Sequence, residues 1–153
     1  MHPPSIDDLM HLLYASQEFP AAKAGGAEDA SALDHALRTA ALLRRSHPSD
    51  KELQTAGLVH RIGAPLRPGE PAAHIAARGA ETVRPLLGRR VTRLVLLQEP
   101  TTDTDFDQAP YAEDALTLRH AAAAATLDGL GVGVLEDWRP VLEIVAAAAR
   151  VRV

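Results

Sequence analysis

The sequence contains no cysteine among its 153 residues, and aromatic side chains make up only 3% of it. Without cysteine the chain can form no disulfide, thiol nucleophile or thiolate zinc site, so any bound metal must use His, Asp or Glu ligands. Alanine is abundant instead, as in the run HAAAAATL at 120–127. Small side chains of this kind favour closely packed helices.

The chain also lacks an excess of positive charge, because 16 basic residues face 20 acidic ones and the net charge is −4. This balance gives no reason to expect a nucleic acid or an acidic lipid as partner, and it favours a small molecule or another protein. No stretch approaches the roughly 20 apolar residues that span a membrane, and the start MHPPSIDDLMHLLYA does not resemble a signal peptide. We therefore expect a cytoplasmic protein without a membrane contact, either monomeric or oligomeric.

The pattern of apolar residues and capping signals predicts one all-α domain over 1–153, a bundle of six or seven helices. The second helix is expected to begin at Ser31 with Asp34 completing a capping box, and the third to run from a box at Ser49 to Gly63. Pro85 should end or kink the fourth helix. The expected helices start at Ser5 and cover 31–45, 49–63, 71–87, 89–98 (a strand being the alternative there), 111–127 and 138–150.

His60 is the first residue that suggests chemistry. It follows Leu53, Ala56 and Gly57 at helical spacing, so its imidazole should point inward with them. A single inward histidine is most often a hydrogen-bonded core residue. Here, however, His35 lies near the start of the preceding helix and His74 near the start of the following one, so the three imidazoles are expected to converge.

The residue after His60 opposes a metal. Imidazoles on separate helices bind transition metals, but such sites usually add carboxylates that neutralise the ion. Arg61 stands where a carboxylate would be expected, and its guanidinium carries a permanent positive charge and no acceptor. An Arg61 that points into the site therefore repels a cation.

The segment 33–63, LDHALRTAALLRRSHPSDKELQTAGLVHRIG, resembles the opening of an HD-domain protein, where a first His is followed by a His-Asp pair. DALTLRH at 114–120 and WRPVLE at 138–143 extend the resemblance over roughly 25–145. The closest likeness is to the HD-domain oxygenases that act on phosphonates with a mixed-valence di-iron centre, relatives of the inositol oxygenases. The resemblance implies a helical HD-domain bundle around a metal site.

Only part of the ligand set that this resemblance implies is retained. His35 matches the first metal ligand, His60 the His of the His-Asp pair, and His74 the third His. Every carboxylate ligand is lost, because Arg61 replaces the bridging Asp and the late Asp falls near Ala122. A further His is also lost, since its position falls near Gln98. Glu28 matches a glutamate of the lid, although Gly25 replaces the companion tyrosine. A di-iron centre should therefore not assemble, and no cofactor is expected.

Three functions remain open. The first is a degenerate HD-domain pseudoenzyme that acts as a binding or regulatory module. The second is an enzyme with a rebuilt site, in which His60 and Arg61 are catalytic, His35 being the alternative general acid or base. Glu28, Arg61 and Gln98 would bind a small phosphate, phosphonate or carboxylate. The third is a single Fe or Zn on the three residual positions His35, His60 and His74, completed by water or by an aspartate of the 103–107 loop.

Two arrangements of Arg61 follow from these alternatives. In one, a cavity is ringed by the residual ligand positions and Arg61, and it takes a small molecule or ordered water. In the other, Arg61 fills that space and pairs with Glu28, Asp34 or Glu81, because a buried arginine needs a carboxylate partner.

Overall fold

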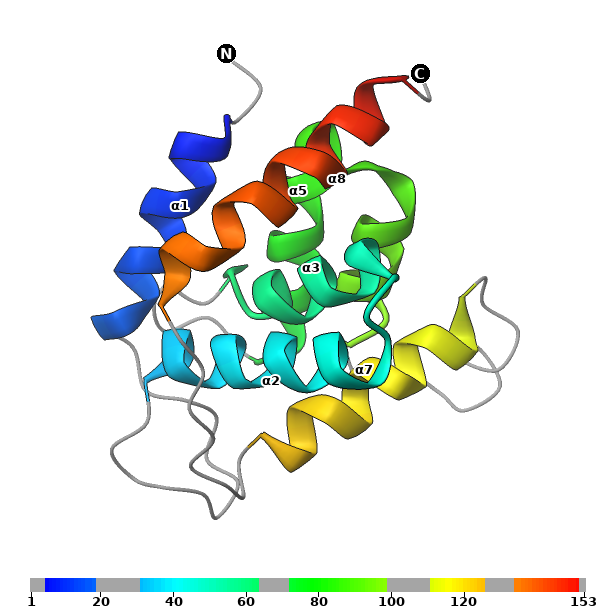
Figure 1. Cartoon of the computed structure of the whole chain (residues 1–153). Coiled ribbons are helices and arrows are strands. Elements are labelled where there is room, and N and C mark those ends of the chain that lie inside the picture. Colours follow the sequence, from blue (N-terminus) through cyan, green and yellow to red (C-terminus); the bar gives the residue numbers. More distant parts are fainter. Residues whose placement is uncertain (1–4, 19–30, 64–71, 99–110, 126–133, 152–153) are drawn as a thin grey trace.

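The computed structural model describes residues 5–18, 31–63, 72–98, 111–125 and 134–151. Over these residues it forms six α-helices and no strand, which confirms the all-α expectation (Figure 1). The helices are α1 (Ile6–Ala15), α2 (Ala32–Ser46), α3 (Lys51–Val59), α5 (Ala72–Leu96), α7 (Ala112–Ala124) and α8 (Arg139–Val151), and 3-10 turns occupy Ser16–Glu18 and Leu135–Trp138.

Helices α1 and α2 begin at complete capping boxes. The hydroxyl of Ser31 accepts a hydrogen bond from the backbone N–H of Asp34 at 3.1 Å, and the Asp34 carboxylate accepts from the N–H of Ser31. Ser5 and Asp8 form the same reciprocal pair at the start of α1. Both starts were expected from the sequence, since this pairing satisfies N–H groups that have no partner within the helix.

The expected bounds of α3 are wrong at both ends. Asp50, not Ser49, is the N-cap, because its carboxylate accepts from the backbone N–H of Leu53 at 3.1 Å. The helix ends at Val59, four residues before Gly63, and His60 is its C-cap. Gly63 instead marks a close approach to α5, since a Cβ there would collide with the backbone carbonyl of Ile75.

The expected fourth and fifth helices, 71–87 and 89–98, are two helical segments that meet at a kink inside the element α5, and the strand alternative for 89–98 is wrong. Pro85 lies inside α5 without ending it. The kink falls at Gly88, whose φ of 88° and ψ of 179° are not helical. A residue with a side chain is strained at this φ, so the glycine permits the change of direction.

The end of the chain follows the expected order with small shifts in the bounds. Tyr111 precedes α7 in a left-handed conformation with φ 67°. Trp138 belongs to the 3-10 turn before α8, and Pro140 lies in the first turn of α8, where its missing N–H costs no helical hydrogen bond.

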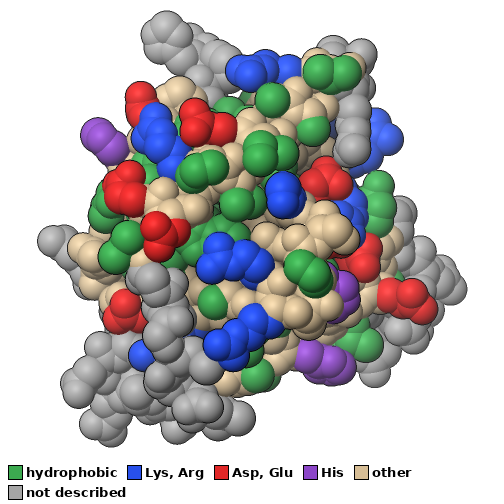
Figure 2. All heavy atoms as spheres, viewed as in Figure 1, with side chains coloured by type: hydrophobic (Ala, Val, Ile, Leu, Met, Phe, Trp, Pro, Cys, Tyr) green, Lys and Arg blue, Asp and Glu red, His purple; other side chains and the backbone are tan. Residues whose placement is uncertain are grey.

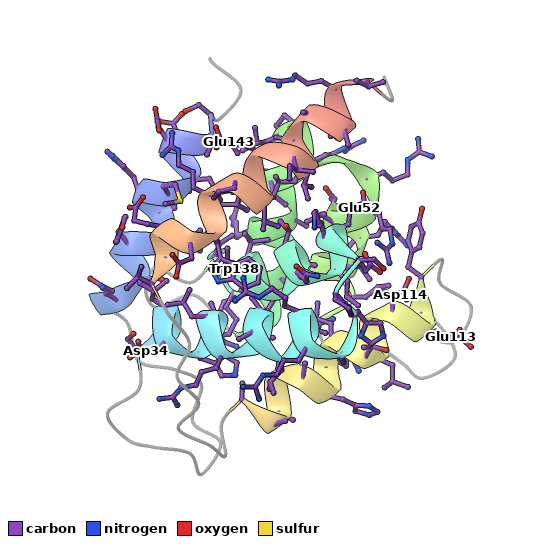
Figure 3. The ribbon with its side chains drawn as sticks, viewed as in Figure 1. Asp34, Glu52, Glu113, Asp114, Trp138 and Glu143 are labelled. Carbon is purple, nitrogen blue, oxygen red and sulfur yellow. The ribbon has the colours of Figure 1, made fainter. Side chains whose placement is uncertain are left out.

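Helix α3 lies at the centre of the bundle and packs against α2, α5, α7 and α8 (Figure 1). Most of its residues are buried, and they join a core built from all six helices. The indole of Trp138 is fully buried in this core, while Glu143 of α8 points outward (Figure 3). The guanidinium of Arg44 covers the Trp138 ring at 4.5 Å from its centroid, a cation–π contact.

Across the face shown in Figure 2, acidic and basic side chains are interspersed with apolar ones, and neither sign of charge dominates. Within the described ranges, none of the helices is both long enough and apolar enough to cross a membrane.

Candidate functional site: a histidine pair beside two arginines

A helix–turn–helix places His35 and His60 together. Helices α2 and α3 are joined by the short turn 47–50 and pack against each other, so the start of α2 lies beside the end of α3. His35 is in the first turns of α2, and His60 is the C-cap of α3. Their ring centroids are 5.5 Å apart with the planes inclined at 58°, and the residues are only 6% and 5% exposed. The expected convergence of these two histidines is therefore observed.

The hydrogen bonds of the two imidazoles define their tautomers. Nδ1 of His60 lies 2.6 Å from the carbonyl oxygen of Gly57, and Nε2 of His35 lies 2.8 Å from that of Ala122. A carbonyl can only accept, so these two ring nitrogens carry the protons of the neutral rings. Nε2 of His60 and Nδ1 of His35 are then the atoms with free lone pairs. Nδ1 of His35 is buried without a hydrogen-bond partner.

Burial keeps both imidazoles neutral. It is the main cause that lowers the pKa of His60 to about 3, and the neighbouring His35 and Arg61 lower it further. The pKa of His35 is also lowered, first by burial and then by the charges of Arg61 and Arg38, although its bond to the Ala122 carbonyl opposes the shift. Protonation of either imidazole is thus strongly disfavoured at this place in the fold.

Two arginines supply the positive charge of the site. The guanidinium of Arg61 lies near enough to disfavour protonation of both histidines, and Arg38 acts on His35 in the same way. The Nε atoms of Arg61 and Arg38 are buried and have no hydrogen-bond partner. Burial also lowers the pKa of Arg61, because its charged form is poorly solvated there. The positive charge of Arg61 therefore acts on both histidines of the pair.

Two carboxylates expected as partners of Arg61 have other contacts. Asp34 completes the cap of α2 and lies at its outer end (Figure 3), while Glu81 is 3.9 Å from Arg78. In the part of the chain that the structure describes, Arg61 forms no ion pair with a carboxylate. The third expected partner, Glu28, lies outside the described residues, as does Gly25.

The remaining predicted site residues do not join the pair. His74 is exposed near the start of α5. The amide nitrogen of Gln98 donates to the carbonyl oxygens of Leu94 at 3.1 Å and Ala115 at 3.3 Å, which ties α5 to α7. The aspartates of the 103–107 loop lie outside the described residues.

These observations do not fit the di-metal centre that an HD-domain resemblance implies. Among the described residues there is no group of three or more His, Asp or Glu that could hold a metal ion. Ala122 stands where the resemblance implies a ligand Asp. Its backbone carbonyl accepts the hydrogen bond from Nε2 of His35, so this nitrogen has no lone pair for a metal. Two nearby guanidinium groups add repulsion against any cation.

Sequence reasoning missed Arg38 and the carbonyl of Ala122. Arg38 had a usable signal, because it lies three residues after His35 and thus on the same face of α2. The carbonyl had none, since every residue has one and its direction depends on how α7 packs against α2.

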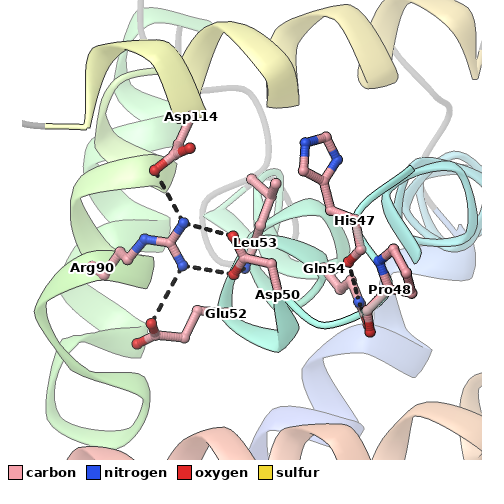
Figure 4. Close-up of polar contacts among 8 residues, drawn as sticks. All are labelled: His47, Pro48, Asp50, Glu52, Leu53, Gln54, Arg90 and Asp114. Carbon is pink, nitrogen blue, oxygen red and sulfur yellow. Dashed lines mark hydrogen bonds and ion pairs between the residues drawn. The ribbon is translucent and has the colours of Figure 1, made fainter. Parts of the chain in front are cut away.

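A second polar cluster, centred on Arg90, fixes the start of α3 (Figure 4). Arg90 donates to both oxygens of Asp50, at 2.7 and 2.8 Å, to Glu52 at 3.3 Å and to Asp114 at 3.0 Å. These bonds join α5 to the beginnings of α3 and α7. They raise the pKa of Arg90 and hold that of Asp50 below its usual range.

No protein-family model matches this chain, and no curated protein is significantly similar to it. The function therefore has to be argued from the residues of the histidine pair and its two arginines.

Proposed function

We propose that this protein is a non-catalytic binding module whose ligand is a small anion held by Arg61 and Arg38 beside the neutral pair His35 and His60. The observation that carries the proposal is the buried, unpaired Nε of both arginines next to two imidazoles that cannot accept a proton readily. A cation in such surroundings is costly unless an anion accompanies it.

The chemistry of the site selects the ligand class. A guanidinium presents a planar fork of donors that matches the oxygens of phosphate, phosphonate or carboxylate. The protonated Nε atoms of the two arginines have no protein acceptor, so an anion would satisfy them without displacing an internal bond. Nε2 of His60 has a lone pair in the neutral ring, and it would accept a hydrogen bond from a hydroxyl group or a monoprotonated phosphonate of the ligand.

The architecture supports the same conclusion when the HD-domain resemblance is added to it. In this proposal the chain keeps an HD-like helical frame, replaces the bridging Asp by Arg61, and thereby exchanges a cation site for an anion site. Such a module would bind its ligand either by itself or as a regulatory partner of another protein.

An enzyme with a rebuilt site is the second candidate, and the neutral His60 beside Arg61 favours it. A general base works best when its pKa is near the working pH. The pKa of His60 is about 3, roughly four units below neutrality, so the free site holds a poor base. Binding is therefore preferred over proton transfer.

Calorimetric titration tests the proposal with three probes, inorganic phosphate, methylphosphonate and acetate, on the wild type and on Arg61→Gln. We expect saturable binding to the wild type and an affinity lower by about ten- to hundredfold in the variant, the value of a charge-assisted hydrogen bond of roughly 1.5–3 kcal/mol. Arg45→Gln is the matched control, because Arg45 is an exposed arginine near the end of the same helix as Arg38. Equal affinity in wild type and Arg61→Gln would refute the role of Arg61.

Elemental analysis of protein purified without chelator provides an independent check. The proposal predicts much less than one iron per chain. Two iron atoms per chain would overturn it in favour of a di-iron centre.

A further inference from the structure

A separate hollow on the outer surface of α5 is lined by arginines. It has a volume of about 450 Å³, and its described lining consists of Arg84, Arg89, Thr92, Arg93 and Leu96. No carboxylate belongs to this described lining. A concentration of three positive charges is unexpected on a chain whose net charge is −4.

The backbone of α5 brings the three arginines together. Arg89 and Arg93 are four residues apart in the part of α5 after the kink, so their side chains lie on one face, and Arg84 approaches from before the kink at Gly88. Like charges at this spacing weaken a helix. Three arginines around one hollow therefore bring no evident stability to α5 itself.

The neighbouring Arg90 is an arginine with a structural role, and its contacts differ from those of the three arginines of the hollow. Arg90 contacts three carboxylates, Asp50, Glu52 and Asp114. Within the described ranges, Arg84, Arg89 and Arg93 form no ion pair, and the nearby Glu81 is paired with Arg78. Their guanidinium groups are therefore free to bind a ligand.

We propose that this arginine hollow binds the phosphoryl groups of a small phosphorylated molecule. Arginine forks bind phosphate oxygens in pairs, and the volume lies within the range of small-molecule pockets. Leu96 gives the hollow an apolar wall for the remainder of the ligand. The hydroxyl of Thr92 donates to the Gly88 carbonyl at 2.6 Å, so the three guanidinium groups are the side-chain donors that remain for the phosphate.

A nucleic acid is the less suitable partner. Three arginines are few beside the roughly six to ten phosphate contacts that a DNA-binding protein can make, and the net charge of −4 opposes a polyanion. The hollow also differs in position from the histidine pair, since all of its described lining lies on α5. The two proposed sites can therefore be separated by mutation.

Calorimetric titration with inorganic pyrophosphate tests this proposal on the intact chain. We expect saturable binding that is weakened about tenfold by Arg89→Gln and by Arg93→Gln, since each removes a charge-assisted contact. Arg45→Gln, on the exposed side of α2, should bind pyrophosphate as the wild type does. Circular dichroism spectra that match the wild type confirm that each variant folds.

Three outcomes with the wild type and the α5 variants would overturn the proposal, and a fourth comes from Arg61→Gln. The three are a wild type that fails to saturate at millimolar pyrophosphate, unchanged affinity in both α5 variants, and tighter binding of a single-stranded oligonucleotide than of pyrophosphate. Arg61→Gln separates the two sites, because it should leave pyrophosphate binding at α5 intact. Loss of pyrophosphate binding in Arg61→Gln alone would assign the ligand to the histidine pair and refute the α5 site.

Discussion

The imidazole rings of His35 and His60 lie with centroids 5.5 Å apart, and each donates its ring proton to a backbone carbonyl. The two carbonyls, those of Ala122 and Gly57, belong to different helices. The geometry of the pair therefore depends on the packing of α2, α3 and α7, and a shift of any of these helices should change the hydrogen bonds of the histidines.

The pH dependence of stability should reveal the buried histidines. The pKa of His60 falls from an ordinary 6.5 to about 3 on folding, so the unfolded chain binds the proton more readily. The contribution of His60 is fully present above pH 6.5 and is lost as the pH falls from 6.5 toward 3, by up to about 1.4 kcal/mol per pH unit. His35 acts in the same direction.

Urea unfolding at pH 7.5, 6.5 and 5.5 measures this effect. The wild type should lose stability below pH 6.5, and His60→Gln should show a shallower loss. His11→Gln is the control, because His11 is exposed on α1. A wild type that is equally stable at pH 7.5 and 5.5 would contradict the buried, neutral state of the pair.

Arg61→Met should separate ligand binding from stability. Burial of an unpaired guanidinium is unfavourable, so an apolar side chain of similar length should leave the free energy of unfolding unchanged or raise it by about 1 kcal/mol. The affinity for the anion should fall about ten- to hundredfold at the same time, as for Arg61→Gln. Chemical unfolding of the ligand-free variant gives the answer, and a loss of more than about 1 kcal/mol would show that Arg61 stabilises the fold.

Arg90 should behave in the opposite way. Arg90→Met leaves Asp50, Glu52 and Asp114 without their common partner, and we expect a loss of about 2 kcal/mol, less than for a fully buried pair because the carboxylates are 22–40% exposed. Arg150→Met, at an exposed position of α8, should cost less than about 0.5 kcal/mol. Equal effects of the two substitutions in urea unfolding would show that the cluster is not structural.

Gly63→Ala should be strongly destabilising. The added Cβ would meet the backbone carbonyl of Ile75, which cannot turn away as a side chain can, so α3 and α5 would have to separate. We expect a loss of about 2–3 kcal/mol, within the range of overpacked positions. Thermal unfolding measures the effect, and Ala77→Gly, at an exposed helical position of α5, is the control. A smaller loss of stability in Gly63→Ala than in Ala77→Gly would contradict this view.

The sequence predicted the helices well because their signals are local. Ser5, Ser31 and Asp34 act within one turn of their helices, and His35 and His60 were expected to converge because they lie on successive helices. The error at α3 arose from a long-range contact. Ser49 and Asp50 are equally good caps by type, and Arg90, forty residues later, favours Asp50.

The site was less predictable than the fold for the same reason. The partial burial of Arg61 depends on how the end of α3 meets its neighbours, and the sequence left both a buried and an exposed Arg61 open. The sequence pointed to Pro85 for the kink of α5, but the backbone turns at Gly88, where a positive φ is free of strain.

Nuclear magnetic resonance of the imidazole groups in histidine-labelled protein tests the central claim most directly, because it locates the anion as well as detecting it. The signals of His35 and His60 are assigned by His35→Gln and His60→Gln. Methylphosphonate added to the wild type should shift both signals along one saturation curve, and that curve should move to about ten- to hundredfold higher concentrations in Arg61→Gln but stay in place in Arg93→Gln. Saturable binding of methylphosphonate with the signals of His35 and His60 unchanged would contradict the account.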